Sequence, residues 1–131
     1  MGLDQYAYRV ERGEIPEGVE VDFELPETQA SEDFYWRKNH YLQGWMERLY
    51  QEKGGQESFN CVNLKLTRED LLRLKEDIEA KRLNQTTGFF YGSDFDYYGE
   101  DGYAKEDLAF VEEALRAIDE EEEDIVYSSW W

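Results

Sequence analysis

The strongest constraint on the fold is the alternation of two hydrophobic periods along the chain. Three segments place apolar residues at the three- and four-residue spacing of an amphipathic helix, and short segments between them place apolar residues at alternate positions, as strands do. Strands that alternate with helices favour a sheet covered by helices. The sequence therefore predicts an α+β or α/β fold, with a single sheet of about four strands and three helices packed on it.

The three predicted helices each have a recognisable apolar stripe, and two have clear start signals. Asn39 is a suitable N-cap for a helix over about 40–53. Thr67 and Asp70 form a variant of the capping box for the second helix. The third helix is predicted over about 104–119. The apolar stripes consist of Leu42, Trp45, Met46 and Leu49 in the first helix, Leu71, Leu74 and Ile78 in the second, and Leu108, Val111, Leu115 and Ile118 in the third.

Four short segments rich in aromatic or aliphatic residues are typical of strands. They cover residues 2–10, 59–66, 88–93 and 125–131. The glutamate-rich segment 11–30 is predicted to be a long acidic loop, in which the alternation over 19–25 would also allow a short edge strand. Trp130 and Trp131 end the last strand, and we expect both to be packed against the fold. Residues 1–131 contain no linker that divides them, so one domain is expected.

The net charge of −18 is concentrated at the two ends of the sequence. Residues 1–30 contain 8 acidic and 2 basic residues, residues 91–131 contain 14 and 2, and the middle is balanced. Aromatic residues make up 16%, which is too many for a disordered acidic chain. The negative field disfavours nucleic acid and anionic membranes as partners and favours a basic protein surface. Solubility is the simpler explanation of the same charge.

The single cysteine and the lack of long apolar segments indicate a cytoplasmic protein. Cys61 lies in a strand-like apolar run, so we expect a buried and inert thiol. One cysteine excludes an internal disulfide and fits a reducing compartment. No segment is apolar for long enough to form a membrane-spanning helix or the core of a signal peptide.

No sequence motif predicts a cofactor, a metal site or a catalytic residue. The segment from Asp94 to Gly99 is similar to the start of a calcium-binding EF-hand loop, but Lys105 stands where a bidentate glutamate is required. We interpret it as a solvated loop. His40 is the only histidine, and its place in the first turn of a helix is typical of a surface or capping residue. As a general base it would need a nearby carboxylate, such as Asp33 or Glu47.

The segment Tyr35-Trp36-Arg37-Lys38 joins two large aromatic residues to a basic pair. We interpret Trp36 as a core residue, with Arg37 and Lys38 paired to the acidic surroundings. The alternative is a binding platform in which Trp36 and Arg37 offer a flat aromatic and cationic surface to a partner.

Several segments together resemble a family of small proteins carried by tailed bacteriophages. They are the start Met-Gly-Leu-Asp-Gln-Tyr-Ala-Tyr, the Tyr35–Asn39 segment, the helix with Trp45 and Met46, and the segment Gly88–Ser93. The resemblance covers most of the chain. It implies a role during infection of a bacterium and assigns no catalytic residues.

The function predicted from these features is that of a non-enzymatic acidic phage accessory protein that binds a basic surface of a host or phage protein. Its sharpest form is a DNA mimic whose carboxylates replace phosphates in the groove of a nuclease, a defence protein or a transcription factor. The alternatives are a small enzyme that uses His40 or a carboxylate-bound metal, and a structural or assembly role. The run 120–124 is expected to extend into solvent. The candidate partner-binding residues are Trp36, Arg37, Asp94, Asp96, Glu100, Asp101, Glu120, Glu121, Glu122, Glu123 and Asp124.

Overall fold

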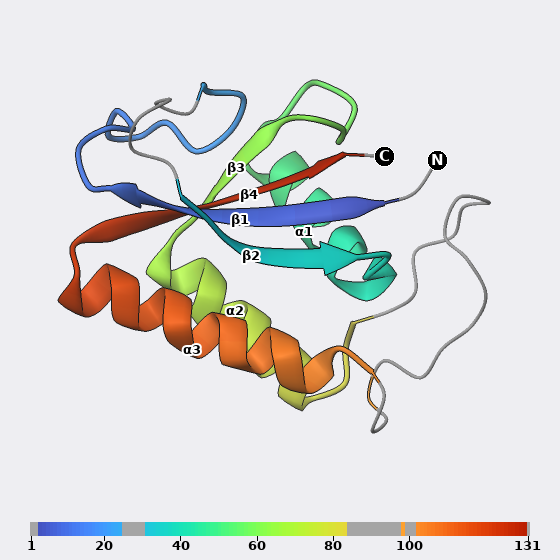
Figure 1. Cartoon of the computed structure of the whole chain (residues 1–131). Helices are drawn as coiled ribbons and strands as arrows, with labels where there is room; N and C mark the ends of the chain where they lie inside the picture. Colours follow the sequence, from blue (N-terminus) through green and yellow to red (C-terminus); the bar gives the residue numbers. More distant parts are fainter. Residues whose placement is uncertain (1–2, 25–30, 84–97, 99–101, 131) are drawn as a thin grey trace.

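The protein has an α+β fold built on one antiparallel sheet, as the sequence predicted (Figure 1). The computed structural model describes residues 3–24, 31–83, 98 and 102–130. In chain order the elements are β1 (Asp4–Glu11), β2 (Ser31–Arg37), α1 (His40–Glu52), β3 (Asn63–Leu66), α2 (Arg68–Glu79), α3 (Ala104–Glu120) and β4 (Glu123–Trp130).

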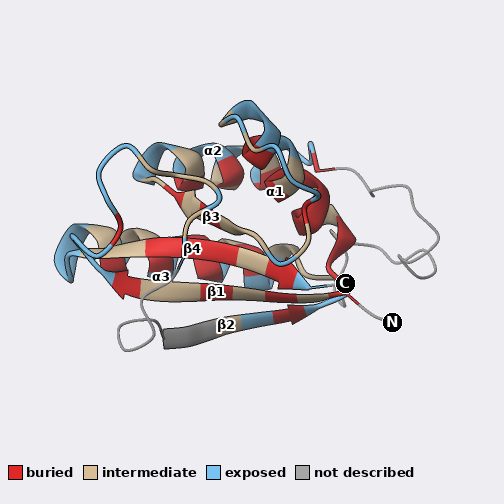
Figure 2. Cartoon of the chain, turned by 90° about the horizontal axis from the view of Figure 1, so that it is seen from above, coloured by how far each residue is buried: buried red, intermediate tan, exposed pale blue. Residues whose placement is uncertain are grey.

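The described sheet has the strand order β2-β1-β4-β3. Its two central strands are therefore the first and the last of the chain, and they pair along their whole length, from Asp4 opposite Trp130 to Glu11 opposite Glu123. Helices α2 and α3 lie below the sheet in Figure 1. From above, the strands lie in front of α3, and β2 forms the margin of the molecule (Figure 2).

The main core lies between the sheet and the helices. Alternate residues of the central strands, such as Ala7, Ile125 and Tyr127, face it and are fully buried. A second, smaller cluster lies on the other face of the sheet, where Ile15 packs on Val10 and Val126. The segment after β1 is therefore more than a solvated acidic loop, because it covers part of the sheet.

The possible edge strand within this segment is a single β-bridge in the structure. Val21 pairs with Leu64 of β3. Two hydrogen bonds flank the bridge: the backbone N–H of Lys65 donates to the Glu20 carbonyl at 2.8 Å, and that of Asp22 donates to the Asn63 carbonyl at 3.2 Å. Pairing beyond residue 24 lies outside the described residues.

Both predicted helix starts are confirmed. The Asn39 side chain accepts a hydrogen bond from the backbone N–H of Leu42 at 3.2 Å. The capping box is complete: the backbone N–H of Asp70 donates to the Thr67 hydroxyl at 3.2 Å, and the Thr67 N–H donates to the Asp70 carboxylate at 2.9 Å. These local bonds satisfy amide groups that the first helical turn leaves without partners.

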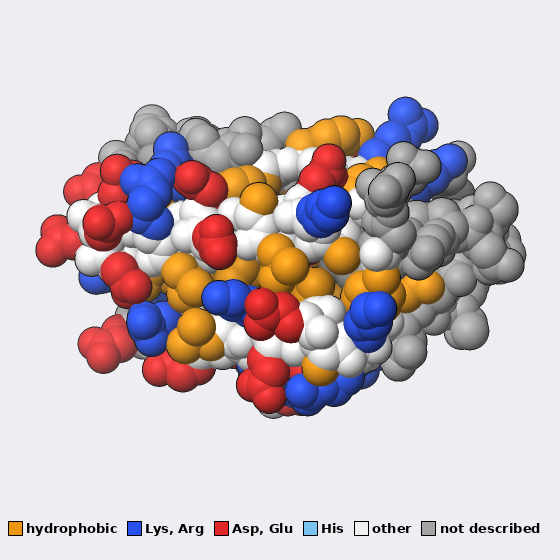
Figure 3. Space-filling model, turned by 90° about the horizontal axis from the view of Figure 1, so that it is seen from below, with side chains coloured by type: hydrophobic (Ala, Val, Ile, Leu, Met, Phe, Trp, Pro, Cys, Tyr) orange, Lys and Arg blue, Asp and Glu red, His pale blue; other side chains and the backbone are white. Residues whose placement is uncertain are grey.

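The predicted apolar stripe of α3 is only partly correct. Val111 is fully buried, whereas Leu108, Leu115 and Ile118 are half-buried and pack at the margin of the core. The residues most deeply buried are Asp107, Phe110, Val111, Ala114 and Ala117. Ala114 and Ala117 are small, so the helix can lie close to the rest of the core. A stripe defined by large aliphatic residues does not include them. Seen from below, hydrophobic side chains form a band with charged side chains on both sides (Figure 3).

The strand predictions differ from the structure at β2 and at the start of β3. The third strand, β3, begins at Asn63 rather than Phe59. Before it, Cys61 has a left-handed φ of 61° and an exposed thiol, so the prediction of a buried cysteine is wrong. Its backbone N–H donates to the Ser129 carbonyl at 2.7 Å, which turns the chain at this point. Strand β2 was not predicted, and the segment 88–93 lies outside the described residues.

Trp130, the last residue of β4, is also placed differently from the prediction. It is 65% exposed, so the expectation that it is packed against the fold is wrong, and Trp131 lies outside the described residues. Trp130 pairs with Asp4 across the central strands, so its exposed side chain stands at the edge of the molecule near both chain ends. Strand pairing holds its backbone without burying the indole.

Candidate functional site

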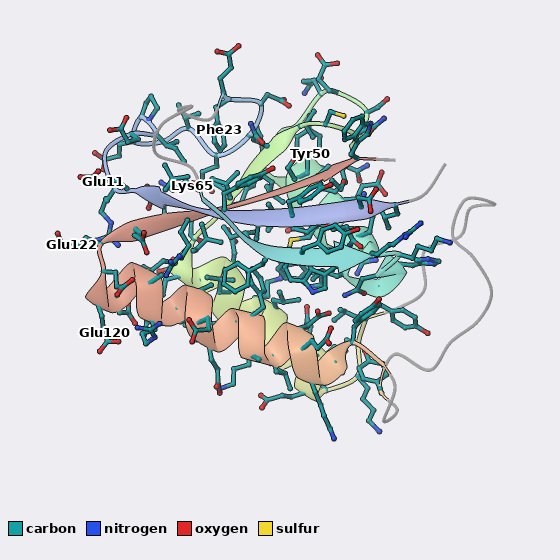
Figure 4. The ribbon with its side chains drawn as sticks, in the orientation of Figure 1. Glu11, Phe23, Tyr50, Lys65, Glu120 and Glu122 are labelled. Carbon is teal, nitrogen blue, oxygen red and sulfur yellow. The ribbon has the colours of Figure 1, made fainter. Side chains whose placement is uncertain are left out.

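Acidic residues from the two acid-rich ends of the sequence lie together at one end of the molecule. Strands β1 and β4 pair so that Glu11 lies opposite Glu123, and the backbone N–H of Arg12 donates to the Glu122 carbonyl at 3.0 Å. Figure 4 places Glu11, Glu120 and Glu122 at this end. From below, acidic side chains gather at the same end (Figure 3). We call the side chains of Glu11 and Glu120–Glu123 the acidic end.

Two arginines hold the acidic end in place. The Arg9 guanidinium lies 3.5 Å from the Glu121 carboxylate and 3.8 Å from that of Glu123. Arg12 donates to two backbone carbonyls, of Ile118 at 2.5 Å and of Glu123 at 3.4 Å. A cation at the last turn of a helix satisfies carbonyls that have no helical partner and opposes the negative end of the helix dipole.

The prediction that residues 120–124 extend into solvent is therefore wrong. Glu120 is the last residue of α3, Glu121 is its C-cap, and Glu122 turns the chain with a φ of 53°. Glu123 and Asp124 then begin β4 and are half-buried. Acidic residues are unfavourable at the C-terminal end of a helix, but Arg9 and Arg12, far away in the sequence, compensate for them here.

The acidic end still presents several carboxylates to solvent. Glu11, Glu120, Glu121 and Glu122 are exposed. A shallow cleft of about 520 Å³ lies between the two acidic segments and is lined by Glu11, Arg12, Glu121, Glu122 and Glu123. Four of the five lining side chains are carboxylates, so the cleft favours a cationic group such as a lysine or arginine side chain of a partner.

Trp36 and Arg37 do not form a shared platform. Trp36 is 4% exposed, and its indole N–H donates to the Asp107 carboxylate at 2.8 Å. Its interpretation as a core residue is correct. Arg37 is exposed, and its carbonyl accepts a hydrogen bond from the Tyr103 hydroxyl at 2.9 Å. The exposed aromatic residue of this segment is Tyr35, whose hydroxyl donates to Asp4 at 2.6 Å.

His40 is buried, which corrects the expectation of a surface or capping residue. Only 2% of its surface is exposed, and Asn39 is the residue that caps α1. Burial, with a smaller contribution from the charge of Lys38, lowers the pKa of His40 below its ordinary value of 6.5. A neutral imidazole inside the fold has no direct access to a substrate in solution.

A buried polar network beside the core was not predicted from the sequence. The Asp107 carboxylate accepts hydrogen bonds from Trp36 and from the Asn39 amide, at 2.8 and 3.0 Å. Gln5 donates to the Asn39 carbonyl at 2.9 Å and accepts from its backbone N–H at 2.8 Å. The network ties β1, β2, α1 and α3 together. The only feature of this network that the sequence indicated is Asn39, through its preference for the N-cap position.

The remaining candidates fall outside the described residues or find no support there. Asp94, Asp96, Glu100 and Asp101 lie among the residues that the structure does not describe. Within the described ranges, no group of three or more His, Cys, Asp or Glu residues is arranged to hold a metal ion. Among the same residues, no helix is both long and apolar enough to cross a membrane.

Comparison with known proteins adds no family assignment. Neither the models of known protein families, nor the curated proteins, nor the solved structures contain a match to this chain.

Proposed function

We propose that the protein is a non-enzymatic bacteriophage accessory protein that works in the bacterial cytoplasm by binding a basic surface of a host or phage protein. The observation that best supports this proposal is that acidic residues from the two ends of the sequence lie together at one end of the molecule, through the pairing of β1 with β4. This pairing places Glu11, from one acid-rich end of the sequence, beside Glu120–Glu123, from the other.

The acidic end combines a fixed backbone with exposed charge. Arg9 and Arg12 hold the turn between α3 and β4, so its backbone does not have to be ordered when a partner binds. Glu11 opposite Glu123 is a like-charge pair across two strands, which a cation from a partner would relieve. Complementary charge accelerates the encounter of two proteins and selects among partners.

The sharpest form of the proposal is a DNA mimic. In that form the carboxylates of the acidic end take the places of phosphates in the DNA-binding groove of a nuclease, a restriction or CRISPR component, or a transcription factor. DNA would then compete with the acidic protein for its partner. The enzyme alternative gains no support from His40, because that side chain is buried.

The test neutralises the acidic end without altering the arginines that hold it. Glu11, Glu120 and Glu122 are replaced by Gln in one variant, and three exposed glutamates elsewhere, Glu57, Glu79 and Glu112, in a matched control. Both variants have the same net charge. Wild type and variants are immobilised, lysate of an infected host is passed over each at low and high salt, and the retained proteins are identified and purified.

The association rate of each purified partner is then measured by surface plasmon resonance. We expect the acidic-end variant to lose the partner through an association rate at least about tenfold slower, while the control retains it. Equal capture and equal association rates for the two variants would refute the proposal. Displacement of the partner by duplex DNA tests the mimic specifically.

A further inference from the structure

A second surface, separate from the acidic end, lies where the edge of the sheet meets α3. A groove of about 360 Å³ runs between β2 and α3. It is lined by Phe34, Tyr35 and Trp36 from the strand and by Glu106, Ala109, Phe110 and Glu113 from the helix. None of these residues belongs to the acidic end, so the two surfaces can be altered independently.

The floor of the groove is apolar and held in place. The Phe110 ring lies edge-on to Phe34 and Trp36, with ring centres 4.8 and 4.9 Å apart. The hydrogen bond from Trp36 to Asp107 fixes the indole, and Asn39 fixes Asp107 in turn. A floor anchored in this way does not have to be ordered when a ligand enters, which favours binding.

On the helical wall of the groove, the small residue Ala109 lies between Glu106 and Glu113. Ala109 is exposed and leaves space that a larger side chain would fill. Glu106 and Glu113 are exposed three residues before it and four residues after it, so all three share one side of the helix. The two glutamates are separated by about 10 Å along the helix axis, given the rise of an α-helix.

The other wall is β2, an outer strand of the described sheet. In the described sheet β2 pairs only with β1, and Figure 2 shows it at the margin of the sheet. An edge strand presents unpaired backbone N–H and C=O groups to an incoming chain. Figure 1 shows β2 and α3 running in a similar direction, and residues of both line the groove, so a strand added to β2 would follow it.

We propose that this groove binds an extended basic segment of a protein partner by strand addition to β2. The segment pairs its backbone with the strand, places an apolar side chain over Ala109 against Phe34 and Phe110, and directs basic side chains toward Glu106 and Glu113. Residues two positions before and after the apolar one face the same side and are about 13 Å apart. Lysine and arginine side chains are long and flexible enough to bridge the difference between this spacing and the spacing of Glu106 and Glu113.

Charge decides between a basic partner and a second copy of this chain. A copy carries the same net charge of −18, and by sequence β2 itself contains Glu32 and Asp33. Two copies docking through this surface would each bring Glu106 and Glu113 to it, and their equal negative charge opposes the approach. The same charges attract a basic segment. The inference goes beyond the proposed function, because it assigns a different surface and a different mode of binding.

The probe is the peptide Thr-Lys-Thr-Leu-Thr-Lys-Thr with blocked ends, and its control carries Glu in place of Lys. Binding is followed by NMR through the backbone amides of the protein. We expect the amide chemical shifts of residues 34–36 and 106–113 to change saturably with the lysine peptide. We expect no such change with the glutamate peptide. Amides of β2 should exchange with solvent more slowly in the complex, because strand addition gives them partners.

Two variants test the assigned contacts. Ala109→Leu fills the groove and keeps a good helix-forming residue, so we expect a folded protein that binds the peptide at least about tenfold more weakly. Glu106→Gln with Glu113→Gln should weaken binding similarly, whereas the matched control Glu79→Gln with Glu112→Gln should not. The acidic-end variant should bind the peptide like wild type, which separates this inference from the proposed function.

Three results would overturn the inference. The first is unchanged peptide binding by Ala109→Leu. The second is slow exchange of all β2 amides in the free protein, which would mean that the chain itself covers the edge. The third is a concentration-dependent dimer that excludes the peptide, which would make a second copy the occupant.

Discussion

His40 begins α1 with 2% of its surface exposed. Burial, assisted by Lys38, lowers its pKa below 6.5 in the folded protein, whereas the unfolded chain takes up the proton near that value. Between the two pKa values the unfolded state binds more protons, so His40 makes the free energy of unfolding fall as the pH falls below about 6.5. As the only histidine, it gives a single imidazole signal in an NMR titration, which should report a pKa below 6.5.

The control for this prediction is His40→Gln. The acidic surface also responds to pH, so the informative quantity is the difference in unfolding free energy between wild type and variant, measured by urea denaturation at pH 7.5 and 5.5. The wild type should lose more unfolding free energy than His40→Gln when the pH is lowered from 7.5 to 5.5. A titration at or above 6.5, with no such shift, would contradict the assignment of a buried neutral imidazole.

Single residues were predictable where their role is local. Asn39 and Thr67 cap their helices through bonds to amides three residues away, so sequence spacing was sufficient to identify them. Asp107 was missed because its partners, Trp36 and Asn39, are distant in sequence. Cys61 was misplaced because apolar alternation does not reveal that the backbone turns there with a positive φ.

At the scale of elements, the join between α3 and β4 depends on Arg12. Its guanidinium donates to the carbonyls of Ile118 and Glu123, which brackets the turn. We predict that Arg12→Gln lowers the free energy of unfolding by on the order of 1 kcal/mol, because a charge-assisted pair of bonds is lost. Hydrogen exchange should also accelerate over residues 118–124, which checks that the loss is local.

The matched control is Arg68→Gln. Arg68 pairs with Asp119 through exposed side chains only, at 3.2 Å, and such pairs contribute little to stability. This change should leave exchange at 118–124 unchanged. Equal effects of the two substitutions would show that general charge, rather than the bracket made by Arg12, holds the turn.

The elements show where sequence periodicity is sufficient. The existence of α1, α2 and α3 was predicted because each has an apolar stripe at helical spacing. Strand β2 was missed because Tyr35, Trp36 and Arg37 were considered as a cluster of side chains instead of as an alternation across a sheet. The run after α3 was misjudged because the arginines that hold it lie on and just after β1.

The whole molecule has more acidic than basic residues, and pairing cannot remove the excess. With 32 acidic and 14 basic residues, 18 carboxylates remain without a basic counterpart even if every lysine and arginine is paired. We predict that the melting temperature rises between about 10 mM and 500 mM sodium chloride, because ions screen the remaining repulsion. The acidic-end variant should show a smaller rise than wild type. A melting temperature that falls with salt would mean that ion pairs dominate.

The class of the fold followed from the sequence, but the arrangement of its strands did not. Alternating periods indicate how many strands and helices to expect, whereas strand neighbours depend on contacts between distant segments. The acidic end illustrates the difference. Its residues were prominent in the sequence, and only the pairing of β1 with β4 brings Glu11 to Glu123.

The position of β1 and β4 at the centre of the sheet also determines when the protein can fold. The pairing of Asp4 with Trp130 joins residues 126 positions apart, which makes it a highly non-local contact. During translation, α1 and α2 can form before β4 has been made, but the centre of the sheet has to wait for the final strand to leave the ribosome. Until then β1 lacks its main partner, and the charge along the nascent chain keeps such molecules apart.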